Sequence, residues 1–173
     1  MEQFAELLEQ HQPMVFRTLA RLMGEREGLE DLAQEVFLRL FRALPHFQRR
    51  SKLSTFLYRI IVNVVNDEFR RRQEARRMVS IDEEVYTLPH PAPGPGDLLE
   101  QSRLLEALEA GLADLNMRDR TILVLHYQEG RSYEEIAAIL GLPMGTVKTH
   151  LHRARERLKV TLRERSLPCK TKC

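Results

Sequence analysis

Four polar side chains share one face of a predicted helix near the C-terminus, and all of them can form hydrogen bonds. Between residues 144 and 158, apolar residues recur at spacings of four, three and four, which marks a buried stripe. At about 100° per residue, the opposite face carries Lys148, Thr149, His152 and Arg153. Arg and Lys can donate to guanine or to phosphate, Thr can donate or accept, and His can donate or stack. This face therefore has the chemistry to read nucleic acid.

The residues before this helix predict a helix-turn-helix. Ser132 and Glu135 have the spacing of a capping box, which satisfies two amide donors at a helix start. Gly141 offers a left-handed residue to end that helix, and Pro143 and Gly145 lie where the chain must turn. A short helix, a tight turn and a second helix with a cationic outer face form the unit that enters the major groove of DNA. The alternative is a helical hairpin whose charged face is only solvated.

Helical periodicity runs through the rest of the chain and no strand pattern is sustained, so we expect an all-α fold. Apolar residues recur at helical spacing in residues 2–23, 29–44, 54–77 and 98–115. Pro13 should kink the first helix or start a new one. Asn116 is placed to cap a further helix. Together with the helix at 98–115, it must cover the apolar stripes of the helix-turn-helix, which could not fold alone.

Two of these helices also carry polar outer faces. On the helix at 54–77, side chains at spacings of four, three and four share one face: Arg59, Asn63, Asn66 and Arg70. Amide and guanidinium groups above a basic tract fit a nucleic-acid surface, and a frayed, soluble helix end is the alternative. On the helix at 29–44, the outer face holds Asp31, Gln34, Glu35 and Leu38. A single exposed leucine is normal on a protein surface.

The length of the chain allows one ordinary domain or two small ones. The chain has 173 residues, of which 30% are charged and 43% hydrophobic, with a net charge of +2. Residues 79–100 hold no Lys or Arg, whereas residues 148–165 are mostly basic. Residues 79–97 are rich in Pro, Gly and acid, which predicts a semi-extended linker. No apolar run is long enough to cross a bilayer and the N-terminus lacks a signal-peptide pattern, so we expect a cytoplasmic protein.

Both cysteines, Cys169 and Cys173, lie in the last five residues, so no disulfide framework is expected. They are weak candidates for a soft metal or a redox pair, because two thiolates do not complete a tetrahedral site. A tail without function is the alternative. We find no other metal-ligand spacing, no glycine-rich phosphate loop and no nucleophile-base set, so neither an enzyme nor a cofactor is expected.

Three segments, read in order, resemble a bacterial RNA polymerase sigma factor of the extracytoplasmic-function (ECF) group. They are LEDLAQEVFLRLFRAL, LSTFLYRIIVNVVNDEFRRR and LNMRDRTILVLHYQEGRSYEEIAAILGLPMGTVKTHLHRARERL. The resemblance runs from about Phe4 to Leu162. Many relatives have tryptophan where this chain has Phe41 and Phe56, and the tail is not part of the shared pattern.

The resemblance implies two small helical domains joined by a flexible linker. A sigma region 2 domain would occupy residues 1–78 and bind core polymerase and the minus-10 promoter element. Residues 79–97 would be the linker, and residues 166–173 a tail. A sigma region 4 helix-turn-helix at 98–165 would bind the minus-35 element.

The resemblance also assigns a partner to each polar face. The polymerase-binding residues would be Asp31, Gln34, Glu35 and Leu38. The minus-10 contacts would be His46, Lys52, Arg59, Asn63, Asn66 and Arg70, with Asn63 near an unstacked base. The minus-35 contacts would be Lys148, Thr149, His152 and Arg153 at bases, with Arg131, Tyr133 and Thr146 near phosphates. His150 and His152 leave the base preference open.

Small sigma factors of this group are commonly held inactive by an anti-sigma protein, so such a partner is expected. The rival interpretation is a stand-alone helix-turn-helix regulator that responds to metal or thiol state through its tail. The N-terminal half distinguishes the two, because a regulator has no need of the outer faces at Asp31 to Leu38 and at Asn63 and Asn66.

Overall fold

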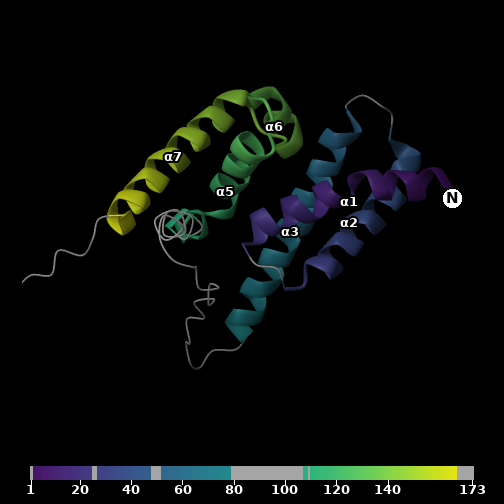
Figure 1. Cartoon of the computed structure of the whole chain (residues 1–173), viewed down its shortest axis with the longest axis horizontal. Coiled ribbons are helices and arrows are strands. Elements are labelled where there is room, and N and C mark those ends of the chain that lie inside the picture. The colour runs from purple at the N-terminus through teal and green to yellow at the C-terminus, as the bar shows by residue number, and fades with distance from the viewer. Residues whose placement is uncertain (1, 25–26, 48–51, 79–106, 109, 167–173) are drawn as a thin grey trace, which may run out of the picture.

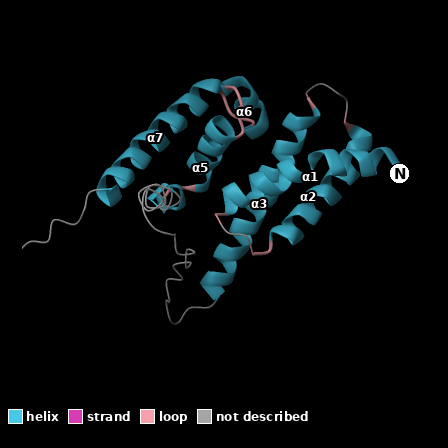
Figure 2. Cartoon of the chain, in the orientation of Figure 1, coloured by secondary structure: helices cyan, strands magenta, loops and turns pink. Residues whose placement is uncertain are grey.

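The computed structural model describes residues 2–24, 27–47, 52–78, 107–108 and 110–166. Every regular element among these residues is a helix, which confirms the predicted all-α class (Figures 1 and 2). The expected linker at 79–97 and the cysteines of the tail lie outside the described residues.

The first half of the chain forms a group of helices that we call the N-terminal bundle. Its elements are α1 (Glu2–Met23), α2 (Leu29–Ala43), the 3-10 turn η1 (Leu44–His46) and α3 (Leu53–Met78). Helix α2 packs against both α1 and α3. Apolar stripes of the three helices meet in a core that includes Val15, Leu19, Leu22, Val36, Leu40, Leu57, Ile61 and Val65.

At Pro13, helix α1 continues as one element, so no new helix starts there. Proline leaves the carbonyl of Glu9 without its helical donor, but both residues are exposed, so water can satisfy that carbonyl. The apolar stripe of α2 is not buried throughout, because Phe41 is 55% exposed and contacts Phe4 edge to face at a centroid distance of 5.0 Å.

The second half forms the C-terminal bundle. Its elements are α5 (Met117–Leu123), the π-helical turn η2 (Val124–Gln128), α6 (Tyr133–Leu140) and α7 (Met144–Ser166). Helix α7 packs against α5 and α6. Asn116 caps α5 by accepting a 2.9 Å hydrogen bond from the Asp119 amide, as predicted.

The helix-turn-helix has the predicted helix start and stop signals. The Glu135 amide donates to the Ser132 hydroxyl at 3.1 Å, and the Ser132 amide donates to the Glu135 carboxylate at 3.0 Å, so the capping box is complete. Gly141 has φ of 65°, a left-handed conformation that a side chain would disfavour, and α6 ends there. Helix α7 starts three residues later at Met144.

The two bundles are packed together. Helix α3 contacts α6, and α1 contacts α5 and η2. One apolar cluster contains residues from both bundles, including Leu22, Leu57, Leu125 and Ile136. Helix α2 lies on the side of the N-terminal bundle away from α7 (Figure 1).

Candidate nucleic-acid interface

The outer face of α7 presents the predicted base-reading side chains to solvent. Val147, Leu151 and Ala154 are buried, as the stripe predicted. The residues of the opposite face are all exposed: Lys148, Thr149, His152 and Arg153. The Thr149 hydroxyl donates to the Gly145 carbonyl at 2.9 Å, which leaves its oxygen free to accept. Three cationic or titratable side chains on one turn and a half of helix suit a groove lined with acceptors and phosphates.

A buried carboxylate that sequence reasoning did not single out fixes the position of α7. The Asp119 side chain is 4% exposed, and its Oδ1 lies 2.6 Å from Nδ1 of His150. Its Oδ2 accepts a 2.8 Å hydrogen bond from the Asn116 amide. His150 therefore faces α5 and not the outer face, so His152 is the histidine placed to meet a base. The available signal was that His150 lies three residues after Val147 and four before Ala154 of the buried stripe, whereas His152 has neither spacing.

The residues predicted to lie near phosphates are only partly accessible. Tyr133 and Thr146 are half-buried. The Tyr133 ring stacks on His126 at a centroid distance of 5.0 Å, and Lys148 Nζ lies 5.9 Å from the Tyr133 centroid. The Tyr133 ring thus lies within cation–π range of Lys148, a residue of the outer face. Arg131 lies where the two bundles meet.

The polar face of α3 is turned toward the C-terminal bundle. Each side chain of this face is exposed: Arg59, Asn63, Asn66 and Arg70. The last three of them line a cleft of about 450 Å³ whose other wall comes from α5, α6 and the turn after α6, through Met117, Arg118, Thr121, Ile139, Leu140 and Leu142. Arg59 donates from Nη2 to the Ala138 carbonyl in α6. The α3 face is therefore assembled, and most of it forms one wall of this cleft.

The loop before α3 is described only at its ends. His46 is exposed at the end of η1. Lys52 is 79% exposed, with its Nζ 3.8 Å from Oε1 of Glu135. Residues 48–51 between them lie outside the described residues. The two predicted loop contacts thus lie at the same end of α3 as Arg59.

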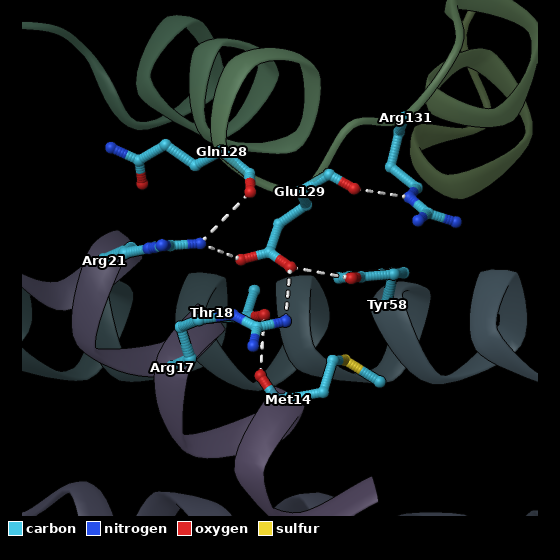
Figure 3. Close-up of polar contacts among 8 residues, drawn as sticks. All are labelled: Met14, Arg17, Thr18, Arg21, Tyr58, Gln128, Glu129 and Arg131. Carbon is cyan, nitrogen blue, oxygen red and sulfur yellow. Dashed lines mark hydrogen bonds and ion pairs between the residues drawn. The ribbon is translucent and has the colours of Figure 1, made fainter.

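Glu129 is a buried acid at the contact between the bundles (Figure 3). Its side chain is 1% exposed. Oε2 accepts from the Tyr58 hydroxyl at 2.8 Å and from Arg17 at 3.3 Å, and Oε1 accepts from Arg21 at 2.6 Å. Arg131 donates to the Glu129 carbonyl at 2.9 Å, and its guanidinium carbon lies 5.3 Å from the Tyr58 ring centroid. Sequence reasoning missed Glu129, because all the donors to its carboxylate are distant from it in the chain.

Electrostatics around Glu129 favour the ionised acid. Burial by itself would raise the pKa of Glu129, but hydrogen bonds from Arg17, Tyr58 and Arg21 outweigh it, so the pKa is lowered. Burial, and then the hydrogen bond to Glu129, raise the pKa of Tyr58 to about 12. The hydrogen bond to Glu129 likewise raises the pKa of Arg17. At neutral pH the contact is an anion held by two cations and a neutral phenol.

A second polar contact joins the bundles through Arg120, which is 8% exposed. It donates to the carbonyls of Leu112 and Ala113 at 2.8 Å each, and to the carbonyl of Leu22 at 3.1 Å. Leu22 lies in the last turn of α1, where carbonyls lack helical donors. Burial lowers the pKa of Arg120. This side chain thus satisfies the end of α1 from within the other bundle.

The predicted polymerase-binding face lies on the outer side of α2. Asp31, Gln34 and Leu38 are exposed, Leu38 at 49%. Glu35 is half-buried and accepts from Arg39 at 2.6 Å, and Arg39 also donates to Asp67 of α3 at 2.7 Å. Glu35 is therefore part of a chain of ion pairs within the N-terminal bundle as well as of this outer face.

Within the part of the chain that the structure describes, no group of three or more His, Cys, Asp or Glu side chains is placed to hold a metal ion. None of the helices in that part combines the length and the apolar character needed to span a bilayer.

Both halves of the chain match known sequence families. Residues 7–75 match the family model of Sigma-70 region 2, and residues 105–158 match that of Sigma-70, region 4. The chain is 38% identical over 166 residues to the ECF RNA polymerase sigma factor SigE of Mycolicibacterium smegmatis, covering 96% of this chain and 64% of that relative. It is 32% identical over 170 residues to the ECF RNA polymerase sigma factor SigW of Bacillus subtilis, covering 93% and 89%.

Solved structures give the same result. The sigma factor RpoE of Bartonella quintana, solved in complex with the anti-sigma factor NepR, superposes with a TM-score of 0.73 at 26% identity, covering 94% of this chain and 98% of that one. CnrH, solved in complex with the cytosolic domain of CnrY, has a TM-score of 0.65 at 26% identity, covering 93% and 88%. This chain therefore belongs to the ECF group of RNA polymerase sigma factors, the proteins through which RNA polymerase recognises promoters and initiates transcription.

Proposed function

We propose that this sigma factor delivers core RNA polymerase to promoters that it reads through two faces, the α7 face at the minus-35 element and the α3 face at the minus-10 element. The observation that carries the proposal is the complete helix-turn-helix, with its capping box, left-handed Gly141 and exposed outer face on α7. The division into a region 2 domain at 1–78, a linker at 79–97 and a region 4 domain at 98–165 remains part of this proposal.

On α7, the outer face combines base reading with phosphate binding. Arg153 and Lys148 can donate to guanine O6 and N7, and Thr149 keeps a free acceptor. His152 adds a donor that His150, held by Asp119, does not supply. Arg131, Tyr133 and Thr146 fix the register of the helix through backbone phosphates, which position a protein without specifying sequence.

On α3, the polar face holds a strand of the minus-10 element once it leaves the duplex. Asn63 accepts and donates at the edge of an unstacked base, since an amide can do both. Arg59 and Arg70 neutralise phosphates on either side of it, with Asn66 between them. His46 and Lys52 extend the same surface through the loop before α3. Such a surface opens DNA by binding the separated strand more tightly than the duplex, and it needs neither catalysis nor a cofactor.

The outer face of α2 binds core polymerase through Asp31, Gln34, Glu35 and Leu38. Exposed Leu38 among acidic and amide groups gives this face an apolar contact that can be buried by a partner. Because core polymerase is the partner, we place the protein in the cytoplasm. An anti-sigma protein is proposed as a further partner, by analogy with the complex of RpoE and NepR.

In vitro transcription with core polymerase over a random promoter library tests the proposal. We expect transcripts that start at a fixed distance from two enriched elements. Asn63→Ala should reduce open-complex formation, and Arg153→Ala should shift the upstream consensus. Arg163→Ala, an exposed arginine farther along α7, is the matched control and should change neither. A chain that binds duplex DNA but gives no transcript with core polymerase would instead support the stand-alone regulator.

A further inference from the structure

We propose that the free chain is latched in a closed form by the Glu129 carboxylate, and that closure restricts access to the α3 face, most of which becomes one wall of a cleft, while the outer face of α7 stays clear of the other bundle. The closure itself is independent of the proposed function. Its consequence for promoter binding rests on the proposed role of the α3 face.

The donors to the Glu129 carboxylate lie in the other bundle, so this residue joins the two bundles and does not stabilise only its own segment. The three hydrogen bonds to its carboxylate come from Arg17, Arg21 and Tyr58, which all belong to the N-terminal bundle. Glu129 itself belongs to the C-terminal bundle, between the π-helical turn and left-handed Gly130. A buried carboxylate is costly unless it is paired, and these partners exist only when the bundles are together. Separation of the bundles would expose the Glu129 carboxylate to water and break its hydrogen bonds to Arg17, Arg21 and Tyr58.

Other polar contacts across the boundary fix the geometry of the closed form. Arg21 donates a second bond to the Gln128 carbonyl at 3.2 Å, and Arg120 reaches the Leu22 carbonyl. Arg59 donates to the Ala138 carbonyl. These three acceptors are backbone oxygens, so their positions follow from the helices and not from mobile side chains. Among the described residues no buried side-chain nitrogen or oxygen lacks a partner, so the boundary is fully satisfied.

Closure affects the two proposed DNA-binding faces differently. Asn63, Asn66 and Arg70 line the cleft between α3 and the C-terminal bundle, and Arg59 is engaged by α6. Arg131 is held over the Tyr58 ring. A strand laid along α3 would have to compete with α6 for Arg59 and enter the cleft beside Asn63, Asn66 and Arg70. The outer face of α7 points away from this boundary and is exposed in the closed form. The closed chain can therefore meet a duplex through α7 before its α3 face becomes available.

The distance between the bundles in the full-length chain tests the latch directly. Spin labels are placed on Glu30→Cys in α2 and Arg155→Cys in α7, both exposed, after Cys169→Ser and Cys173→Ser remove the native thiols. We expect one narrow distance distribution. With Glu129→Gln added, a broad component at longer distance should grow, because breaking a buried pair should raise the open-to-closed ratio roughly a hundredfold.

Glu156→Gln is the matched control, since it removes one negative charge from the same bundle at an exposed position paired only along α7 with Lys159. It should leave the distance distribution unchanged. A narrow, unshifted distribution in Glu129→Gln overturns the latch. If that variant folds poorly, Tyr58→Phe with Arg21→Gln removes two of the donors from the other bundle, and the same readout decides.

Binding of labelled DNA of random sequence tests the occlusion. Glu129→Gln should bind single-stranded DNA more tightly than Glu156→Gln does, while the two variants bind duplex DNA alike, because α7 is open in both. The comparison removes the general effect of one lost negative charge. Equal affinities of the two variants for single strands, alongside a shifted distance distribution, overturn the occlusion of α3. Failure of the proposed function would appear elsewhere, as absence of transcription with core polymerase.

Discussion

The hydroxyl of Tyr58 donates a 2.8 Å hydrogen bond to the carboxylate of Glu129, although 71 positions separate the two residues. Tyr58 directly precedes Arg59 of the α3 face. Glu129 lies two residues before Arg131, which begins the helix-turn-helix segment. One hydrogen bond thus joins the segments that carry the two proposed DNA-binding faces. A substitution of Tyr58 or Glu129 should therefore affect both faces.

Closure should weaken as the pH falls. The charged or titratable groups that face Glu129 are Arg17 and Arg21 from α1, Tyr58 from α3 and Arg131 from its own segment. Because the pKa of Glu129 in the closed chain is below its ordinary value, ionisation supports closure above that ordinary value. This support is lost as the pH falls from that ordinary value through the lowered pKa of Glu129. The label distance, measured from about pH 7 to well below the ordinary glutamate pKa of about 4.3, should therefore lengthen only at the acidic end of the range.

Glu129→Gln separates this effect from the titration of other acids. Glutamine carries no charge at any of these pH values, so the variant should lack the part of the pH dependence that Glu129 causes. Identical pH dependence in the variant and the parent chain would show that another group controls opening.

The elements of the candidate interface that could be predicted are those encoded within a few residues. The capping box of Ser132 and Glu135, the left-handed Gly141 and the Asn116 cap each depend on neighbours three or four positions away. The outward face of α7 follows from the periodicity of its apolar stripe. Such signals need no knowledge of the rest of the fold, and the structure confirms each of them.

The parts that could not be predicted depend on contacts between distant segments. In the sequence, Glu129 is a single acid before a glycine, and the donors to its carboxylate lie 71 to 112 positions away. Asp119 and His150 are 31 positions apart, so their pairing needs the packing of α7 on α5. Helical periodicity assigns each helix a buried stripe but does not say which outer faces meet. The cleft between the α3 face and the C-terminal bundle is of this kind.

The pair of Asp119 and His150 should stabilise the helix-turn-helix. Asp119→Asn replaces a buried acceptor with an amide whose donor faces the Asn116 amide, so it should lower the free energy of unfolding by about 1 to 3 kcal/mol. Urea unfolding followed by circular dichroism measures this. Asp31→Asn, at an exposed position of α2, should change stability by less than about 0.5 kcal/mol. Equal effects of the two changes would mean that the buried pair contributes nothing.

Leu38 should contribute to core polymerase binding and not to stability. Leu38→Ala removes an apolar side chain that is 49% exposed, so we expect weaker affinity for core polymerase and a change in stability below about 0.5 kcal/mol. Val160→Ala is the matched control, because Val160 is 53% exposed on α7, away from the proposed face. Glu35 is less suitable for this test, since it also pairs with Arg39. Equal affinities of the Leu38 and Val160 variants in a binding titration would remove this assignment.

Arg153 and Arg131 should contribute to DNA binding in different ways, Arg153 through a base and Arg131 through a phosphate. Arg153 is exposed on the outer face of α7, so Arg153→Ala should cost about 1 to 3 kcal/mol on the preferred duplex and relax preference at one base. Arg131→Ala should weaken binding similarly on all duplexes. It should also lower the slope of log affinity against log salt by roughly one unit if this residue neutralises one phosphate. The measurement is binding of the full chain to single-base variants of a selected minus-35 duplex at several salt concentrations.

The Arg131 variant has a second expected effect that Arg153→Ala lacks. Arg131 is held at the boundary between the bundles by the Glu129 carbonyl and the Tyr58 ring, so its loss should also lengthen the label distance between the bundles. Arg153 makes no such contact among the described residues, and its variant should leave that distance unchanged. If Arg153→Ala instead loses affinity uniformly across the duplex panel, Arg153 binds phosphate, and α7 does not lie in the groove as its outer face predicts.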